Sequence, residues 1–267
     1  MLKEKIFQVS VFICLLFSTT AFAQLFQKPV VATPQRPSNS YNTSTTPAGW
    51  IEVEFGSAID SHVFDSPVVL KLGLQRNLEL FVGASPLVHV SDGQSESGFG
   101  DVNFGLRSRF GGGMQGLPTF GGVVTVKIPT ANENKGLGTG NTDWTFMIIV
   151  SQSRGHYGLD LNIGFKTTNM SQGQNQSRFL GILTGSTSFT PKLSAYSELF
   201  LSQHVRINST DVGTADANNV IFIGAAGLSY TVSPRFVIDA GLNINITNAP
   251  YDFQFLVGAT STLFKLW

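Results

Sequence analysis

Apolar and polar residues alternate along most of this chain from Trp50 onward, with the two-residue period that places successive side chains on opposite faces of a β-strand. Between Val102 and Phe110, every second position is mainly apolar, whereas the positions between them include Arg107 and Arg109. We count twelve such runs and expect each to form a strand with an oily side and a polar side. They begin near Trp50, Val68, Leu78, Asp101, Thr119, Asp143, Tyr157, Arg178, Leu193, Val220, Phe236 and Asp252.

The connections between the predicted strands alternate in length. Short turns at 75–77, 111–117, 152–156, 190–192 and 233–235 alternate with longer polar stretches at 58–66, 91–100, 130–142, 167–176 and 203–219, and only the last connection of the longer class, 247–251, is short. Outer-membrane barrels have short turns in the periplasm and long loops outside, whereas a soluble sandwich has no reason to sort its loops. The pattern predicts an all-β fold, a transmembrane antiparallel up-and-down β-barrel of about 12 strands over residues 50–267.

The first 23 residues have the three parts of a secretory signal peptide. Lys3 and Lys5 precede the apolar run 6–17, and the small residues Ala21 and Ala23 come before the expected cleavage point. Export of a chain with oily strand faces predicts the outer membrane as its location, with cleavage after Ala23.

A segment rich in Pro, Ser, Thr and Asn, residues 24–49, precedes the first predicted strand. Pro29, Pro34, Pro37 and Pro47 exclude a central strand, because proline lacks the N–H that a ladder needs. The composition favours a flexible periplasmic tail and leaves open a plug folded into the lumen.

The composition fits a protein that contacts lipid and not nucleic acid. Only 13% of residues are charged, and Lys plus Arg equals Asp plus Glu at 17 each, so no excess of positive charge is available to neutralise phosphates. The one cysteine, Cys14, lies inside the predicted signal peptide, which rules out disulfides, thiol catalysis and thiolate metal sites in the mature chain. We assign no metal and no cofactor.

Tryptophan and tyrosine gather where a bilayer meets water, so their positions are a second indication of a membrane barrel. They fall at the turn ends and the loop ends of the predicted strands, which predicts two aromatic girdles. The residues assigned to them are Trp50, Trp144, Tyr157, Tyr230, Tyr251 and Trp267.

If the oily faces look outward, the lumen of the barrel is lined by six acidic and five basic residues. This balance favours internal ion pairs over a strongly ion-selective pore, which would need rings of one sign. Glu79 and Arg109 lie near the same turn and are the pair that strand direction suggests. The predicted lining residues are Glu52, Glu54, Lys71, Glu79, Arg107, Arg109, Lys127, Asp160, Lys166, Glu198 and Asp239.

Two other classes of function are open. A barrel enzyme of lipase or protease type needs a nucleophile beside a base, and the run His89-Val90-Ser91-Asp92 is the nearest approach to one in a sequence without G-x-S-x-G or H-E-x-x-H. A structural or adhesive barrel would use its long loops, but those loops carry few large apolar anchors. Twelve strands lie between filled eight-stranded barrels and wide porins, so passage of small solutes is the preferred function.

Several short stretches resemble the outer-membrane family linked to the meta-pathway of phenol degradation, whose members are regarded as transporters. They are 98–106, 127–130, 138–144, 193–199, 228–236 and 239–241, and the likeness runs from Trp50 to the C-terminus. The resemblance implies a Gram-negative outer-membrane barrel that passes small aromatic or other hydrophobic compounds. Trp267 is similar to the closing residue that such barrels present to their assembly machinery.

Overall fold

The computed structural model describes residues 31–91, 95–112, 117–169, 176–205 and 220–267, which belong to one compact unit. The expected signal peptide, residues 1–23, and the beginning of the proline-rich segment lie outside the described residues. Among the described residues, no helix is long and apolar enough to cross a bilayer.

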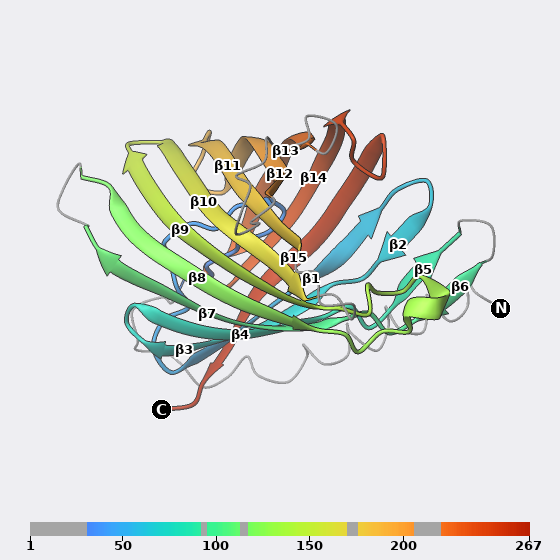
Figure 1. Cartoon of the computed structure of the whole chain (residues 1–267). Coiled ribbons are helices and arrows are strands. Elements are labelled where there is room, and N and C mark those ends of the chain that lie inside the picture. Colours follow the sequence, from blue (N-terminus) through green and yellow to red (C-terminus); the bar gives the residue numbers. More distant parts are fainter. Residues whose placement is uncertain (1–30, 92–94, 113–116, 170–175, 206–219) are drawn as a thin grey trace, which may run out of the picture. The chain divides into compact units, whose positions relative to one another are not determined.

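Twelve long antiparallel strands form a closed barrel (Figure 1). Each strand pairs with the next long strand along the chain, and the first pairs with the last, so that Val53 lies opposite Ser261 and no edge of the long strands is left open. The strands are β1 (Trp50–Ile59), β3 (Val68–Gln75), β4 (Leu78–Ala84), β7 (Val102–Gly111), β8 (Thr119–Ile128), β9 (Thr142–Arg154), β10 (Tyr157–Asn169), β11 (Gln176–Ser188), β12 (Leu193–Val205), β13 (Val220–Ser233), β14 (Phe236–Thr247) and β15 (Phe253–Lys265).

The predicted fold class is confirmed, and every predicted strand begins within two residues of an observed one. Three short strands were not expected, because they lie in or beside stretches that look like polar loops. They are β2 (Val63–Asp65), β5 (Val88–Val90) and β6 (Glu96–Gly98), which extend the sheet from the loop end of β1. A 3-10 turn, η1 (Glu133–Lys135), lies in the connection from β8 to β9.

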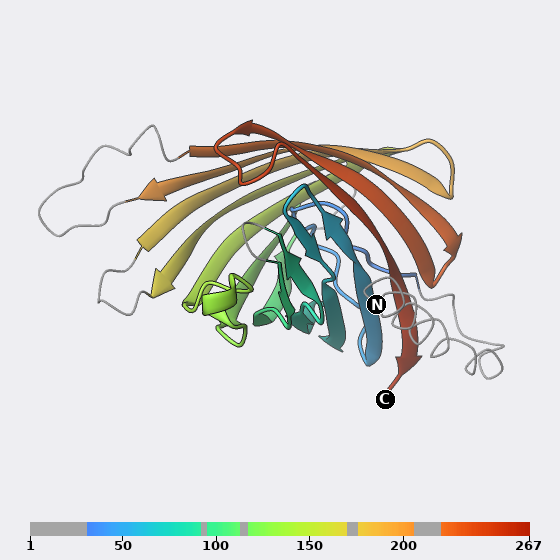
Figure 2. The ribbon, with the colours of Figure 1, turned by 90° about the vertical axis from the view of Figure 1, so that its right-hand side faces the viewer.

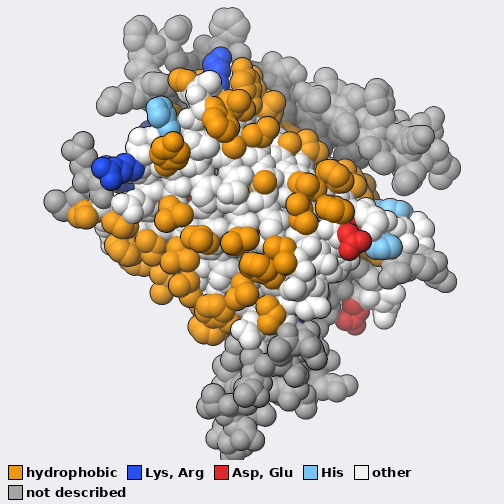
Figure 3. Space-filling view, turned by 90° about the horizontal axis from the view of Figure 1, so that it is seen from above, with side chains coloured by type: hydrophobic (Ala, Val, Ile, Leu, Met, Phe, Trp, Pro, Cys, Tyr) orange, Lys and Arg blue, Asp and Glu red, His pale blue; other side chains and the backbone are white. Residues whose placement is uncertain are grey.

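The two faces of the barrel strands differ as the alternation predicts. On β7, Phe104 and Leu106 are exposed while Arg107, on the other face, is buried. Figure 3 shows hydrophobic side chains spread over the face in view, with its charged side chains near the edges. Ile148 is 60% exposed, which would be costly in water but is expected where a barrel contacts lipid.

Residues 31–49, here called the inner segment, run along the inner wall of the barrel (Figures 1 and 2). From Thr33 to Thr46 the segment meets β1, β15, β14, β12, β11, β10, β9, β8 and β4, which is the order of these strands around the barrel. A short parallel bridge between Ala48 and Gly73 then leads into β1. The inner segment therefore follows the wall as a nearly complete circuit instead of extending away as a tail.

Candidate functional site

The inner segment and the inward side chains that hold it form the candidate site. Its first part is a buried ion cluster on β1 and β3. Lys71 Nζ lies 2.8 Å from Glu52 Oε1 and 2.5 Å from Glu54 Oε1, because Lys71 pairs in register with Glu52 across the two strands. The inner segment completes this cluster: Thr33 donates to both oxygens of Glu52, and the backbone N–H of Gln35 donates to Glu54. The expected lining residues of this sector thus bind one another and the segment.

A second ion pair lies on the next two strands. Arg107 Nη2 donates to both carboxylate oxygens of Glu79 at 2.9 and 3.0 Å, and both side chains are fully buried. The suggested partner of Glu79, Arg109, is wrong: the register places Arg107 opposite Glu79, and Arg109 reaches Asn77 at the turn instead. Glu79 also accepts a hydrogen bond from the N–H of Thr46, so this pair holds the end of the inner segment.

At the loop end of the barrel, Lys127 and Lys166 form ion pairs with aspartates that were not among the predicted lining residues. Asp143 Oδ2 lies 3.1 Å from Lys127 Nζ and 2.8 Å from Lys166 Nζ, and Asp101 lies 3.1 Å from Lys127. Asp101 also accepts hydrogen bonds from the N–H groups of Ala131 and Thr139 in the connection from β8 to β9. This cluster ties that connection to the rim.

The remaining expected lining residues lie apart from the ion clusters. Glu198 binds the inner segment: it accepts hydrogen bonds from the Ser38 hydroxyl, from the backbone and side chain of Asn39, and from the N–H of Ser40. Asp160 accepts one from Ser151 at 2.5 Å. Asp239 is fully buried at the side chain and lies 3.8 Å from Arg36 Nε.

Asn162 is a binding residue that the sequence analysis missed. It is fully buried on β10, its Oδ1 accepts from the N–H of Tyr41 at 2.7 Å, and its Nδ2 donates to the Tyr41 carbonyl at 2.8 Å. An asparagine is well suited to this position because it offers one acceptor and two donors to a backbone that has no strand partner. The only feature of the sequence that could have indicated this role is the position of Asn162 on the polar side of β10.

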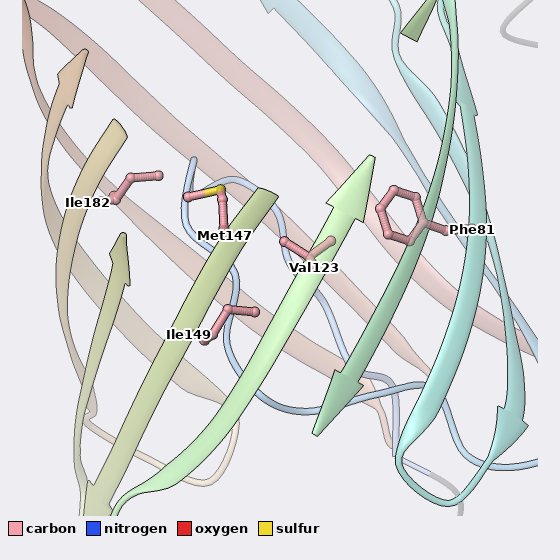
Figure 4. Packing of buried hydrophobic residues seen from close by; sticks show 5 residues of the cluster. All are labelled: Phe81, Val123, Met147, Ile149 and Ile182. Atoms are coloured by element: carbon pink, nitrogen blue, oxygen red, sulfur yellow. The ribbon is translucent and has the colours of Figure 1, made fainter. Parts of the chain in front are cut away.

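The inner wall also carries an apolar cluster that alternation alone did not predict (Figure 4). Its members come from four different strands and are packed by Tyr41, Val69 and Phe200. The signal was present in the sequence as unbroken apolar runs, such as 146–150 on β9, which indicate a strand that is apolar on both faces. The cluster comprises Phe81, Val123, Met147, Ile149 and Ile182.

The aromatic residues assigned to girdles separate into two groups. Trp144, Tyr157, Tyr230 and Trp267 are exposed, as contact with a bilayer boundary requires, and Tyr251 is half-buried. Trp50 does not fit a girdle: it is 3% exposed, on the same face of β1 as Glu52 and Glu54, with the guanidinium of Arg235 4.6 Å from the centre of its ring. Two-residue parity places it inside the barrel.

His89, the candidate base of a barrel enzyme, lies on the short strand β5. Its Nδ1 is 2.8 Å from the hydroxyl of Ser97 and its Nε2 is 3.5 Å from that of Ser95, across the β5–β6 pair. Asp92, the last residue of the sequence run, lies outside the described residues. The structure thus pairs His89 with a different serine from the one that the sequence suggested.

Comparisons with known proteins agree with this fold. A family model described as "Putative MetA-pathway of phenol degradation" matches residues 35–263. The COG4313 outer membrane channel from Pseudomonas putida F1 has a similar structure, with a TM-score of 0.62 at 14% identity, over 85% of this chain and 100% of that one.

Two porins are also similar in fold. The NanC porin matches with a TM-score of 0.53 at 11% identity, over 80% of this chain and 100% of that one. The KdgM porin in complex with disordered oligogalacturonate matches with a TM-score of 0.56 at 6% identity, over 80% of this chain and 99% of that one. No curated protein matches the sequence. The TM-scores and the coverage of these matches show that the chain shares its barrel fold with these outer-membrane proteins.

Proposed function

The chain belongs to the family described as "Putative MetA-pathway of phenol degradation", and on this premise we propose that it is an outer-membrane channel for small aromatic solutes. The observation that carries the proposal is an inner wall with two kinds of surface. One sector presents paired charges on β1, β3, β4 and β7, and another presents the apolar cluster centred on Met147 and Ile149. A solute with a ring and a polar group can contact both.

The charge pattern supports a conduit of weak ion selectivity. The buried carboxylates of the wall are paired with Lys or Arg or hydrogen-bonded to the inner segment, so no ring of one sign is formed by the described residues. The similar structures include a channel and two porins, which supports transport over catalysis. The His89–Ser97 pair takes no part in the proposal.

The inner segment regulates passage in this proposal. Its contacts follow the wall from β1 around to β4, and buried residues such as Ser40, Thr43 and Thr46 fill space inside the barrel. A solute crosses when part of the segment leaves the wall. Because hydrogen bonds to carboxylates hold the segment, its release exchanges them for hydrogen bonds to water, which makes opening reversible.

The proposal includes export and assembly. Cleavage after Ala23 yields a mature chain that begins shortly before the inner segment. In this proposal, the assembly machinery of the outer membrane recognises the last strand, β15, together with the exposed Trp267 two residues beyond it. The exposed apolar side chains of the barrel then face the lipid bilayer.

A flux assay on liposomes tests the function. The full mature protein is reconstituted and the efflux of 4-hydroxybenzoate is measured, because its charge keeps this aromatic from crossing lipid unaided. Efflux well above that from protein-free liposomes is expected. Protein that is folded, as judged by a mobility change on boiling before electrophoresis, and yet gives no efflux refutes the proposal.

A further inference from the structure

The side chain of Tyr41 occupies a distinctive place on the inner wall. Its ring packs against the apolar cluster, with the ring centre 6.3 Å from that of Phe81 and the two planes inclined by 32°. The guanidinium carbon of Arg107 lies 5.7 Å from the centre of the same ring. A phenol group contributed by the protein itself thus lies between an apolar surface and a cation, which is the environment that a small aromatic solute prefers.

Arg107 has hydrogen-bonding capacity that the described part of the chain does not use. Its Nη2 donates to Glu79, while its Nε and Nη1 are buried and have no hydrogen-bond partner among the described residues. Arg107 is 1% exposed, and buried polar groups without a partner are uncommon in native proteins. An oxygen atom on a ligand ring would accept from these two groups.

The wall holds Tyr41 by its backbone. Asn162 binds both its N–H and its carbonyl, at 2.7 and 2.8 Å, and Glu198 binds the residues just before it. Truncation of the side chain leaves these anchors in place, so the expected result is an open space beside Phe81 and the apolar cluster and not a collapsed segment. Apolar cavities of this kind bind small aromatic molecules.

We propose that the ring of Tyr41 occupies a binding subsite for aromatic solutes that carry an oxygen atom, and that such a solute enters by displacing this ring. The ring of the solute packs against the apolar cluster, and Arg107 donates hydrogen bonds to its oxygen. This inference deepens the proposed channel function and rests on it for the solute's identity. In the native chain Tyr41 competes from within the same molecule, at an effective concentration in the millimolar range or above, so free phenol binds weakly.

The test uses the methyl group of Met147, a member of the apolar cluster, as a reporter of the subsite. The full mature protein in detergent is labelled with ¹³C at its methionine methyl groups, Met147→Leu assigns the signal, and phenol is titrated. Tyr41→Ala is expected to bind phenol at least about tenfold more tightly than the native protein, because the internal competitor is gone. Tyr157→Ala is the matched control, since Tyr157 is 72% exposed, and it should behave as the native protein does.

Cyclohexanol distinguishes an aromatic subsite from a merely oily one. Cyclohexanol has the size and hydroxyl of phenol but no π face, so it cannot form a cation–π contact with Arg107. Phenol is therefore expected to bind Tyr41→Ala at least about threefold more tightly than cyclohexanol does. Equal affinity for the two ligands overturns the aromatic part of the proposal. Equal phenol affinity in Tyr41→Ala and Tyr157→Ala overturns the subsite itself.

A second measurement covers the case in which Tyr41→Ala does not fold. In otherwise native protein, Ser40→Cys places a thiol beside Tyr41. Saturating phenol is expected to increase the rate at which a thiol-reactive reagent labels this cysteine at least threefold. An unchanged labelling rate contradicts the proposal. Neither measurement depends on transport. Binding without flux therefore refutes the channel function alone, whereas flux without binding at Met147 refutes this inference alone.

Discussion

Glu198 offers the sharpest test of how the inner segment is held. The change is Glu198→Ala, which removes the acceptor of four hydrogen bonds from the segment, two of them from Asn39 at 3.1 and 2.8 Å and one from the N–H of Ser40 at 3.2 Å. The strand itself should persist, because the backbone of β12 is paired on both sides.

The size of the effect follows from these contacts. Hydrogen bonds to a charged group contribute about 1.5–3 kcal/mol each, but bonds in one network do not add. The segment is also anchored at Glu54 and Asn162, so only its middle is released. We expect local opening to become easier by about 2–4 kcal/mol, which corresponds to a roughly 30- to 700-fold larger open fraction.

Thiol labelling measures this fraction. Ser40→Cys is the reporter, because residue 40 is 6% exposed and should react only when the segment leaves the wall. Its labelling rate is compared with and without Glu198→Ala. The control is Glu96→Ala, a glutamate on the short strand β6 that pairs with Lys135 in the 3-10 turn η1. A rate that rises less than threefold, or rises equally in the control, refutes the claim that Glu198 holds the segment.

Two further predictions concern the stability of the wall, each measured by urea unfolding in liposomes. Lys71→Met should lower the free energy of unfolding by about 3–5 kcal/mol, because it leaves two buried carboxylates of β1 without their cation, whereas Lys192→Met at an exposed turn should change little. An equal effect of the two variants would contradict the buried pairing. Gly105→Ala should cost about 1–3 kcal/mol, because the new methyl group would overlap the packed ring of Phe81, while Gly111→Ala has its nearest atom at 3.8 Å and should be nearly neutral. Full stability of Gly105→Ala would mean that the ring is not packed there.

The sequence predicted the barrel well because its strands are specified locally. Each strand needs only its own two-residue period and the turn that follows, and the registers of neighbouring hairpins then follow from the short turns. The parity of β1 could also have placed Trp50 inside, since it is two residues from Glu52. The preference of tryptophan for a membrane boundary was weaker here than the requirement of strand alternation.

The course of the inner segment could not be predicted, because its partners are remote in the chain. Asn39 lies 159 residues from Glu198, and Tyr41 lies 121 residues from Asn162. Prolines and small polar residues indicate an irregular backbone. They do not show whether that backbone forms its hydrogen bonds with water or with polar side chains of the barrel wall. The inward carboxylates of the wall stabilise the second arrangement by accepting hydrogen bonds from the segment, and their inward direction is fixed only once the barrel is closed.

Tethering the inner segment tests the central claim most directly. The hydroxyls of Ser40 and Thr184 are 2.8 Å apart, so cysteines at both positions lie within reach of a disulfide. Efflux of 4-hydroxybenzoate from liposomes is measured for this double variant before and after reduction, with Ser40→Cys alone as the control. The account predicts efflux that is suppressed in the oxidised protein and restored at least tenfold by reduction. Equal efflux in the two states, with the disulfide verified, would contradict a channel that opens by releasing this segment.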